Sequence, residues 1–465
     1  MQNNPDQFSS KIGFVLAAAG SAVGIGNLVG FPVAAAKNGG GAFLLLYIFF
    51  VVAICLPLIL AELSMGRATG KSPLGAFREI SKGHKGWVLA GALSLITPFM
   101  IAVFYSVLTV WLLGYFLLVL FGQLDQLATP VYFGGFITSP WIFAYLAAVI
   151  AMVIFVLKGG VRDGIEKASR LLMPMLFIML IGLAVFVLTL PNASAGLKFY
   201  FTPQIDRITW NVVNGALSQA FFSLSLGMGI LITYGSYLRK QDNLVQSAKM
   251  LACTDTGVAL VAGLMTLPAI FAIYPNTNPS ELSDSSVGLI FSFFPNIFMA
   301  MVPKFGYAVS SLIAATFFLL AFVAAITSLV SIIEVPVAAL KAEANKSRNR
   351  SLALIISGVL LGAVLCALSF GQVKWLSEFA FYSGGNKSLF DVLVDVFYDT
   401  ILPFNGLLIC LLVTWQWKRH NMGAEMMTEN AQGWLERYTH FAIAFWIPAI
   451  LATVFLITVI NKFFS

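Results

Sequence analysis

The residues best suited to chemistry lie in one stretch, GSAVGIGNLVGFP (20–32), where four glycines, Asn27 and Pro32 interrupt an apolar run that begins near Ile12. Glycine and proline are poor helix formers, so a membrane helix built from this run is expected to break partway across the bilayer. Carbonyl oxygens freed at such a break suit an alkali cation, whereas amides freed at the start of the next half-helix suit an anion. The stretch therefore predicts a site for sodium beside a zwitterion.

The same glycines permit a second interpretation, because Gly20-xxx-Gly24 and Gly26-xxx-Gly30 are small-residue patterns that let helices pack closely. A matching interruption occurs in FFSLSLGMGILITYGSY (221–237), where Ser and Gly residues fall at mid-depth. Two glycine-interrupted spans at corresponding positions of two halves are typical of an inverted-repeat transporter. The pairing of the two stretches favours a binding site over helix packing alone.

Three acidic residues fall inside apolar spans: Glu62, Asp255 and Glu334. Ionisable side chains buried in a membrane mark functional sites by default. Asp255 lies deep, in CTDTG between two threonines, which favours a cation ligand over a structural hydrogen-bond hub. Glu62 lies near the end of its span, where accepting backbone amides is the expected role. The stretch AAITS (324–328) adds a carbonyl and two hydroxyls, although such hydroxyls usually bond to their own helix.

The composition identifies the elements that must position these groups. Of 465 residues, 59% are hydrophobic and only 10% are charged, against roughly 25% charged in soluble domains. The chain is therefore expected to be an all-α polytopic membrane protein, and its N-terminus lacks the basic n-region of a cleavable signal peptide. Eleven transmembrane helices are expected at residues 12–36, 41–66, 87–121, 139–157, 166–190, 209–238, 244–272, 305–340, 351–369, 389–417 and 439–461.

The basic residues set the expected orientation. Twenty of the 27 Lys and Arg residues fall on one side of the predicted spans, which places that side and the N-terminus in the cytoplasm and the C-terminus outside. The net charge of +7 is then a topology signal of an inner (plasma) membrane protein, and no nucleic-acid partner is expected. No histidine lies mid-membrane and the four cysteines serve as apolar filler, so no enzyme activity is expected.

The chain is expected to form a single transmembrane transporter domain over residues 1–465. A first five-helix repeat covers 12–190, a second, inverted repeat covers 209–417, and 439–461 forms an additional eleventh span. The segment 276–304 is too apolar for a plain loop. Its phenylalanines predict helical pieces that pack on the domain as a lid, with an interfacial amphipathic helix as the alternative.

Several of these stretches resemble the signature motifs of the neurotransmitter:sodium symporter family, in its bacterial amino-acid transporter branch (leucine-transporter-like). They are GSAVGIGNLVGFP, NGGGAFLLLY (38–47), AELSMGR (61–67), FFSLSLGMG, TYGSYLRK and AAITS. The resemblance runs from about Lys11 to the end of the tenth span and is most specific in spans one and six. It implies a 5+5 inverted-repeat transporter fold with broken spans 1 and 6 and two sodium sites.

The resemblance also implies which residues form each site. Tyr105 would bond the substrate carboxylate and Phe222 would close over the substrate. The substrate pocket would be lined by Ala22, Gly24, Gly26, Ile101, Tyr105, Phe222, Ser225, Met228, Leu329 and Ile332. The first sodium site would use Ala22, Asn27, Ser223 and Asp255, and the second would use Gly20, Val23, Ala324, Thr327 and Ser328.

One position indicates the substrate class. Monoamine carriers of the family place an Asp where this chain has Gly24, so the ligand here is expected to bring its own carboxylate, as an amino acid does. The GMG at 227–229 resembles members that admit bulky hydrophobic or aromatic amino acids. Chloride use stays open, because Ala259 stands where chloride-dependent relatives carry a hydroxyl, and Asp255 is an alternative source of negative charge.

Two departures from the family pattern concern its gates. The family's outer gate pairs an Arg with an acid on span ten, but this chain has Gly30 at the Arg position, which leaves the roles of Asp395 and Asp399 open. The inner gate Arg is replaced by Pro5, and its acidic partner, expected near Ala342, is also absent. Either other residues close the pathway, or this carrier is unusual in its gating.

The resulting hypothesis is sodium-coupled amino-acid symport into the cell by alternating access. The partners expected are the amino acid and membrane lipid, with no obligatory protein partner evident. Two alternatives remain: a membrane sensor that binds an amino acid at the same site without transporting it, and a proton-coupled carrier that uses Asp255.

Overall fold

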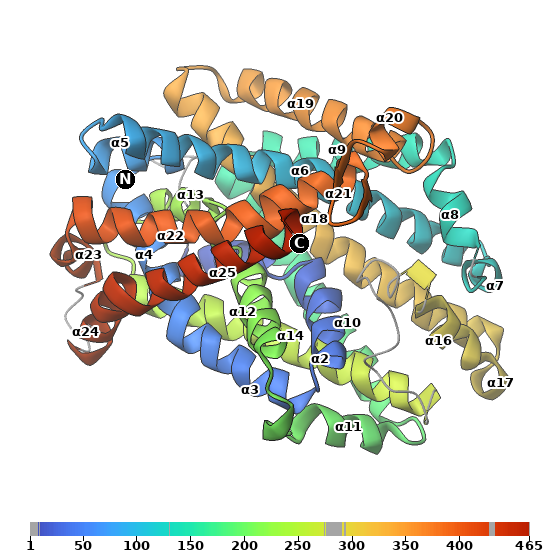
Figure 1. Ribbon diagram of the computed structural model, residues 1–465. Coiled ribbons are helices and arrows are strands. Elements are labelled where there is room, and N and C mark those ends of the chain that lie inside the picture. Colours follow the sequence, from blue (N-terminus) through green and yellow to red (C-terminus); the bar gives the residue numbers. More distant parts are fainter. Residues whose placement is uncertain are drawn as a thin grey trace.

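The computed structural model describes residues 8, 10–129, 131–273, 275, 291–292, 294–426 and 433–464, and over them the chain is almost entirely helical (Figure 1). The first half contains α1 (Lys11–Ala22), α2 (Phe31–Lys37), α3 (Gly41–Phe50), α4 (Leu56–Thr69), α5 (Pro73–Ile80), α6 (Lys85–Leu120), α7 (Leu124–Leu127), α8 (Tyr132–Ile137), α9 (Trp141–Lys158), α10 (Lys167–Leu188) and α11 (Ala193–Phe201). The second half contains α12 (Trp210–Ser223), α13 (Ile230–Ser236), α14 (Leu244–Ile273), α16 (Phe294–Ala300), α17 (Val302–Phe305), α18 (Tyr307–Glu343), α19 (Arg348–Leu368), α20 (Lys374–Ser377), α21 (Leu389–Leu393), α22 (Leu402–Leu412), α23 (Arg419–Met426), α24 (Gly433–Phe441) and α25 (Ile447–Phe463).

Wider π-helical turns join several of these helices into longer spans. They are η1 (Gly26–Gly30), η2 (Val51–Cys55), η3 (Gly160–Glu166), η7 (Val394–Ile401), η8 (Val413–Trp417) and η9 (Ala442–Trp446), and a short 3-10 turn, η4 (Ile205–Arg207), precedes α12. Counted in this way, the described residues contain nine unbroken helices that are long and apolar enough to cross a membrane. They correspond to nine of the eleven spans that the sequence predicts.

The two remaining predicted spans are the ones expected to be broken. The first consists of Ile12–Ala22 and Gly26–Lys37, which meet at an angle of 56°. The sixth consists of α12 and α13, which are separated by six non-helical residues, 224–229. Both breaks expected from the glycines are therefore present.

The break in the sixth span depends on left-handed backbone. Ser225, Gly227 and Gly229 have φ values of 55°, 75° and 69°, a region that glycine enters freely and most other residues avoid. The Glu62 carboxylate accepts a hydrogen bond from the Gly227 amide at 2.8 Å, so an amide released by the break gains a buried partner. This contact confirms the role expected for Glu62 from the sequence, and it satisfies a group that would be costly to leave unpaired.

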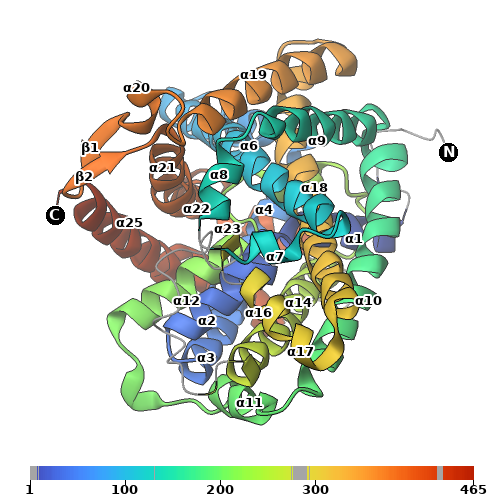
Figure 2. The same cartoon turned by 90° about the vertical axis from the view of Figure 1, so that its right-hand side faces the viewer.

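Long helices form the frame around the breaks. α6 and α18, the two longest, pack extensively against each other (Figure 2), and α13 packs against α4. The α4–α13 contact is close because glycines face backbone on both sides. A Cβ on Gly66 would lie 1.9 Å from the Ile232 carbonyl oxygen, and one on Gly235 would lie 2.6 Å from the Leu63 carbonyl oxygen.

Part of the segment expected to form a lid lies outside the described residues, at 276–290 and Phe293. The part that is described packs onto the bundle. Phe291 is buried against Trp111, Tyr115 and Phe133, and Phe294 of α16 stacks on Phe317 of α18 at 4.4 Å between ring centroids. The described residues therefore support packed helical pieces rather than a helix lying free at the interface.

Three local features differ from, or add to, the sequence-based expectations. A hairpin of β1 (Ala380–Tyr382) and β2 (Gly385–Lys387) lies beside the end of α25, and the sequence analysis did not anticipate it (Figure 2). Three of the cysteines are buried, and the fourth, Cys253, is exposed on the membrane-spanning helix α14. Glu334, an intramembrane acid, is ion-paired with Arg348 at 2.8 Å.

The close α4–α13 contact generates a prediction. Gly66→Ala should destabilise the protein by about 1–3 kcal/mol, as overpacking of a tight interior does, because its Cβ meets backbone that cannot move aside. Gly182→Ala is the matched control, since Gly182 lies exposed in α10 with no atom within 4 Å of the added carbon. Thermal unfolding of the purified proteins measures both, and equal melting temperatures for the two variants would contradict the prediction.

Candidate ion and substrate site

A buried carboxylate, Asp255 of α14, is the centre of the candidate site. The Asn27 side-chain amide lies between two elements: its Nδ2 donates to Asp255 Oδ1 at 2.8 Å and to Ser223 Oγ at 2.7 Å. The Ser223 hydroxyl in turn donates to Asp255 Oδ2 at 2.8 Å. Three of the four residues assigned to the first cation site therefore meet, from η1, α12 and α14.

The described partners of Asp255 are all neutral. Besides Asn27 and Ser223, the Tyr47 hydroxyl lies 3.5 Å from Oδ2, and the Asp255 side chain is completely buried. Removing a carboxylate from water without a counter-charge is strongly unfavourable. The arrangement thus concentrates negative charge at a place where a cation would be stabilised.

The backbone at the first break belongs to the same network. The Asn27 Oδ1 atom accepts a hydrogen bond from the Gly24 amide at 3.0 Å, which satisfies a donor that the end of α1 releases. Gln219 Nε2 donates to the Gly26 carbonyl at 2.8 Å. The fourth assigned residue, Ala22, lies beside this network at the end of α1, where it lines a small cavity.

A second group of oxygens surrounds Ser328 of α18. Its hydroxyl lies 3.5 Å from the Gly20 carbonyl oxygen, 3.0 Å from that of Ser21 and 3.3 Å from that of Val23. One hydroxyl carries one proton, so it cannot satisfy three carbonyls at once. The end of α1 therefore presents carbonyl lone pairs with spare capacity toward α18, as a cation site requires.

The other two residues of α18 assigned to the second cation site are Thr327, next to Ser328, and Ala324, one turn earlier. The Thr327 hydroxyl donates to the carbonyls of Val323 and Ala324 at 3.0 Å each, so it bonds to its own helix as membrane threonines usually do. The five assigned residues lie on two facing segments that pack together: α1 and the residue that follows it provide Gly20 and Val23, and α18 provides Ala324, Thr327 and Ser328.

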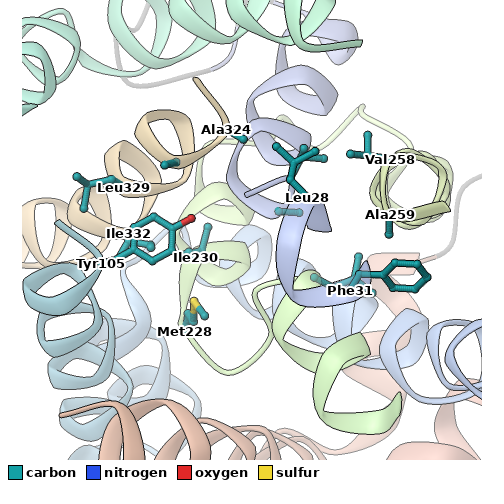
Figure 3. Packing of buried hydrophobic residues seen from close by; sticks show 14 of the residues in the cluster. Leu28, Phe31, Tyr105, Met228, Ile230, Val258, Ala259, Ala324, Leu329 and Ile332 are labelled. Atoms are coloured by element: carbon teal, nitrogen blue, oxygen red, sulfur yellow. The ribbon is translucent and has the colours of Figure 1, made fainter. Parts of the chain in front are cut away.

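A small cavity of about 10 Å³ lies between the two breaks. Eight of the ten residues assigned to the substrate pocket line it: Ala22, Gly24, Gly26, Tyr105, Phe222, Ser225, Met228 and Ile332. Ile101 and Leu329 are buried but do not line the cavity. In Figure 3, Tyr105, Leu329 and Ile332 lie on one side of the breaks with Met228 nearby.

The glycines at the first break make this cavity possible. A Cβ on Gly24 would lie 2.6 Å from Ser328 Oγ and 2.8 Å from the Tyr105 hydroxyl oxygen. A Cβ on Gly26 would lie 2.5 Å from the Phe222 ring. The Tyr105 hydroxyl accepts a hydrogen bond from the Ile25 amide at 3.3 Å, so it shares the polar end of the cavity with the freed backbone.

A larger cavity of about 250 Å³ lies beyond Phe222. Its wall is almost entirely apolar, and it shares Gly26, Tyr105 and Phe222 with the smaller one. The Phe222 ring packs edge-on against Tyr398 of η7, with 4.3 Å between ring centroids. These two rings therefore stand where the two cavities meet.

The sequence analysis missed three residues that belong to this site. Tyr47 bonds Ser223 at 3.3 Å, Gln219 holds the Gly26 carbonyl, and Ser21 lines the smaller cavity. The Ser21 hydroxyl is buried with no hydrogen-bond partner among the described residues. A fully apolar span gave no reason to select Tyr47, although the tyrosine ends the NGGGAFLLLY stretch.

The donor set suits an alkali cation rather than a transition metal. Across the described part of the chain, no group of three His, Cys, Asp or Glu residues could hold a metal ion. Carbonyl, hydroxyl, amide and carboxylate oxygens are hard ligands, which bind hard cations. Hydrophobic side chains, among them Phe222, Met228 and Ile332, line the small cavity beside them.

The chain is similar to known transport proteins over most of its length. A model of the sodium:neurotransmitter symporter family matches residues 5–129 and 131–464. The uncharacterized sodium-dependent transporter YhdH of Bacillus subtilis is 33% identical over 98% of this chain and 98% of its own length. The sodium- and chloride-dependent taurine transporter of Homo sapiens is 28% identical over 64% of this chain and 56% of its own length.

A solved structure matches the whole fold. The crystal structure of MhsT in complex with L-phenylalanine superposes with a TM-score of 0.83 at 35% sequence identity, covering 97% of this chain and 99% of that one. The match confirms the fold class expected from the sequence, an all-α transporter fold with broken spans 1 and 6.

The crowding at Gly24 generates a prediction. Gly24→Ala should destabilise the protein by about 1–3 kcal/mol, and combining it with Ser328→Ala should cost less than the two single changes together, because the second change removes the nearest clashing atom. Unfolding measured in a double-mutant cycle without sodium tests this.

The control cycle combines Gly26→Ala with Ser328→Ala. The added Cβ of Gly26 meets Phe222 rather than Ser328, so these two effects should add. Additive costs in both cycles would mean that Ser328 does not limit the space at Gly24.

Proposed function

Because this chain belongs to the sodium:neurotransmitter symporter family, we propose that it carries a hydrophobic or aromatic amino acid into the cell together with sodium, by alternating access. The chain is a polytopic membrane transporter and not an enzyme, its transport is sodium-dependent, and its substrate is a small molecule. The amino-acid class, the inward direction and the site residues are the parts that we add.

The observation that carries the proposal is the completely buried Asp255 carboxylate, whose described partners are all neutral. We propose that one sodium ion binds there, with Ala22, Asn27, Ser223 and Asp255 as ligands. A second binds between α1 and α18, at Gly20, Val23, Ala324, Thr327 and Ser328. Bound substrate and the first ion would share this network, so each raises the affinity for the other by the same factor.

The substrate class follows from the smaller cavity. Gly24 supplies no charge, and a side chain there would meet Ser328 and Tyr105. The ligand must therefore bring its own carboxylate, which the Tyr105 hydroxyl and the Ile25 amide beside it are suited to bind. Met228, Phe222 and the surrounding apolar residues provide the wall that a hydrophobic side chain needs, and the cavity of about 10 Å³ would have to widen to admit it. L-Phenylalanine, the amino acid held in the MhsT complex, is such a ligand.

We also propose that Asp255 itself supplies the negative charge that chloride would otherwise provide, since Ala259, one turn along α14, has no polar atom on its side chain. The distribution of Lys and Arg supports a cytoplasmic N-terminus and an extracytoplasmic C-terminus in the plasma membrane. Residues 12–190 and 209–417 would be the two inverted repeats, with 439–461 as the additional span.

Uptake into proteoliposomes tests the proposal. A thermal-shift screen of the twenty amino acids, with and without sodium, first identifies the ligand. Its accumulation should then follow an inward sodium gradient and vanish when potassium replaces sodium at fixed pH. Binding without accumulation would favour the sensor, and uptake that ignores sodium but follows a proton gradient would favour the proton-coupled carrier.

The sodium ligand role of Asp255 gives a sharper prediction. In the parent, sodium at a hundredfold its Kd should raise stability by about 2.7 kcal/mol per site, and Asp255→Asn and Asp255→Ala should each lose the share due to the first site together with sodium-driven uptake. Thermal unfolding in sodium against potassium measures this.

Glu62→Gln is the matched control, because Glu62 is another completely buried carboxylate but contacts the Gly227 amide rather than the cation site. It should keep the sodium-dependent shift even if its overall stability falls. If the Asp255→Asn variant keeps the full sodium-dependent stabilisation of the parent, Asp255 is not a ligand of the first sodium site.

A further inference from the structure

The outer end of the tenth span carries two carboxylates one helical turn apart, Asp395 and Asp399 of η7. Carboxylates at this spacing repel each other. Lys462, near the end of α25, forms ion pairs with both, although α25 lies outside the ten predicted repeat spans. A single lysine of the eleventh span therefore pairs with both acids of the tenth and offsets one of their two negative charges.

The hairpin reinforces this contact. The Tyr382 hydroxyl of β1 donates to Asp395 Oδ2 at 2.7 Å, and the Tyr382 ring packs against Phe463, the neighbour of Lys462, at 5.1 Å. Burial, with the hydrogen bond to Asp395 and the charges of the nearby carboxylates, raises the pKa of the Tyr382 hydroxyl, which therefore keeps its proton and remains a donor. Asp395 is thus held by two elements, the strand β1 through Tyr382 and the helix α25 through Lys462.

The neighbouring face of η7, one residue back along the chain, lines the larger cavity. Val394 and Tyr398 form part of the wall of the 250 Å³ cavity, and Tyr398 packs on Phe222, which separates that cavity from the smaller one. Lys462 therefore holds the face of η7 that carries Asp395 and Asp399, and the neighbouring face presents Tyr398 to the cavity. Residue 30 supplies no basic side chain that could compete for Asp399.

We propose that Lys462 is a positioning residue for closure of the outer cavity: by holding Asp395 and Asp399 against α25, it keeps Tyr398 over Phe222. This inference rests on the proposed function, because it takes the larger cavity as the outer part of a transport route. Loss of the lysine would leave two partly buried carboxylates without a counter-charge, and these would turn toward water. η7 would then move with Tyr398, and the cavity would open more often.

Accessibility of the cavity measures this without any substrate. In a Cys253→Ala background, Leu108→Cys places a thiol on the cavity wall, and the three other native cysteines are buried. Adding Lys462→Met should raise the rate of maleimide labelling in the purified full-length protein by roughly tenfold, a typical size for conformational coupling. Lys462→Arg, which keeps the charge, should label close to the rate of the background.

Lys374→Met is the matched control, because Lys374 is an exposed lysine of α20 that forms no ion pair among the described residues. It should leave the labelling rate unchanged. If Lys462→Met does not fold, Asp399→Asn replaces it and should also raise the rate. Labelling at the background rate in either variant would overturn the proposal.

Transport kinetics supply the second measurement. Lys462→Met should raise the KM for the amino acid more than it changes kcat, because closure over the substrate is weakened while the site itself is intact. Combining it with Asp399→Asn should change KM less than the product of the single effects. Absence of sodium-dependent uptake by the parent protein would refute the proposed function alone, since the labelling result does not depend on it.

Discussion

The constraint on which this structure depends is the placement of a carboxylate, Asp255, where water does not reach. Neutral donors from η1, α3 and α12 surround it, and they stabilise its charge only partly. Those donors are available because the first and sixth spans do not continue as helices through the site. The breaks, the hydrogen bonds and the residual negative charge are thus one arrangement, and a monovalent cation is the simplest species that would complete it.

The two cation sites proposed here differ in how they use the backbone. Around Asp255, side chains do most of the bonding, and the Gly24 amide is satisfied by Asn27 within the same turn. Around Ser328, the oxygens are carbonyls at the end of α1, and a single hydroxyl is shared among them. The second site therefore links α1 to α18 directly, so an ion there would affect how firmly the first half-helix is held.

The sequence predicted the elements whose residues are unusual for a membrane. Glycine and proline within apolar runs located both breaks, and polar side chains at the same depth located Asn27, Ser223 and Asp255. It did not locate groups whose role depends on a neighbour distant in sequence. Tyr47 resembles any interfacial aromatic residue, and Lys462 resembles an ordinary flanking lysine, until the fold brings them to Asp255 and Asp399. The resemblance also assigned Leu329 to the pocket; its helix α18 does line the cavity through Ser328 and Ile332, but Leu329 itself is buried without lining it.

The Asn27 contacts have a consequence for biosynthesis. Its partners Ser223 and Asp255 lie 196 and 228 residues further along the chain. The Phe8 carbonyl likewise accepts a hydrogen bond from Arg239, 231 residues later. The first span therefore enters the bilayer long before the groups that satisfy its broken middle have been translated. Until the second half arrives, that span must stay straight, remain near the membrane surface or be shielded by the insertion machinery, so its native shape is among the last features of the molecule to be established.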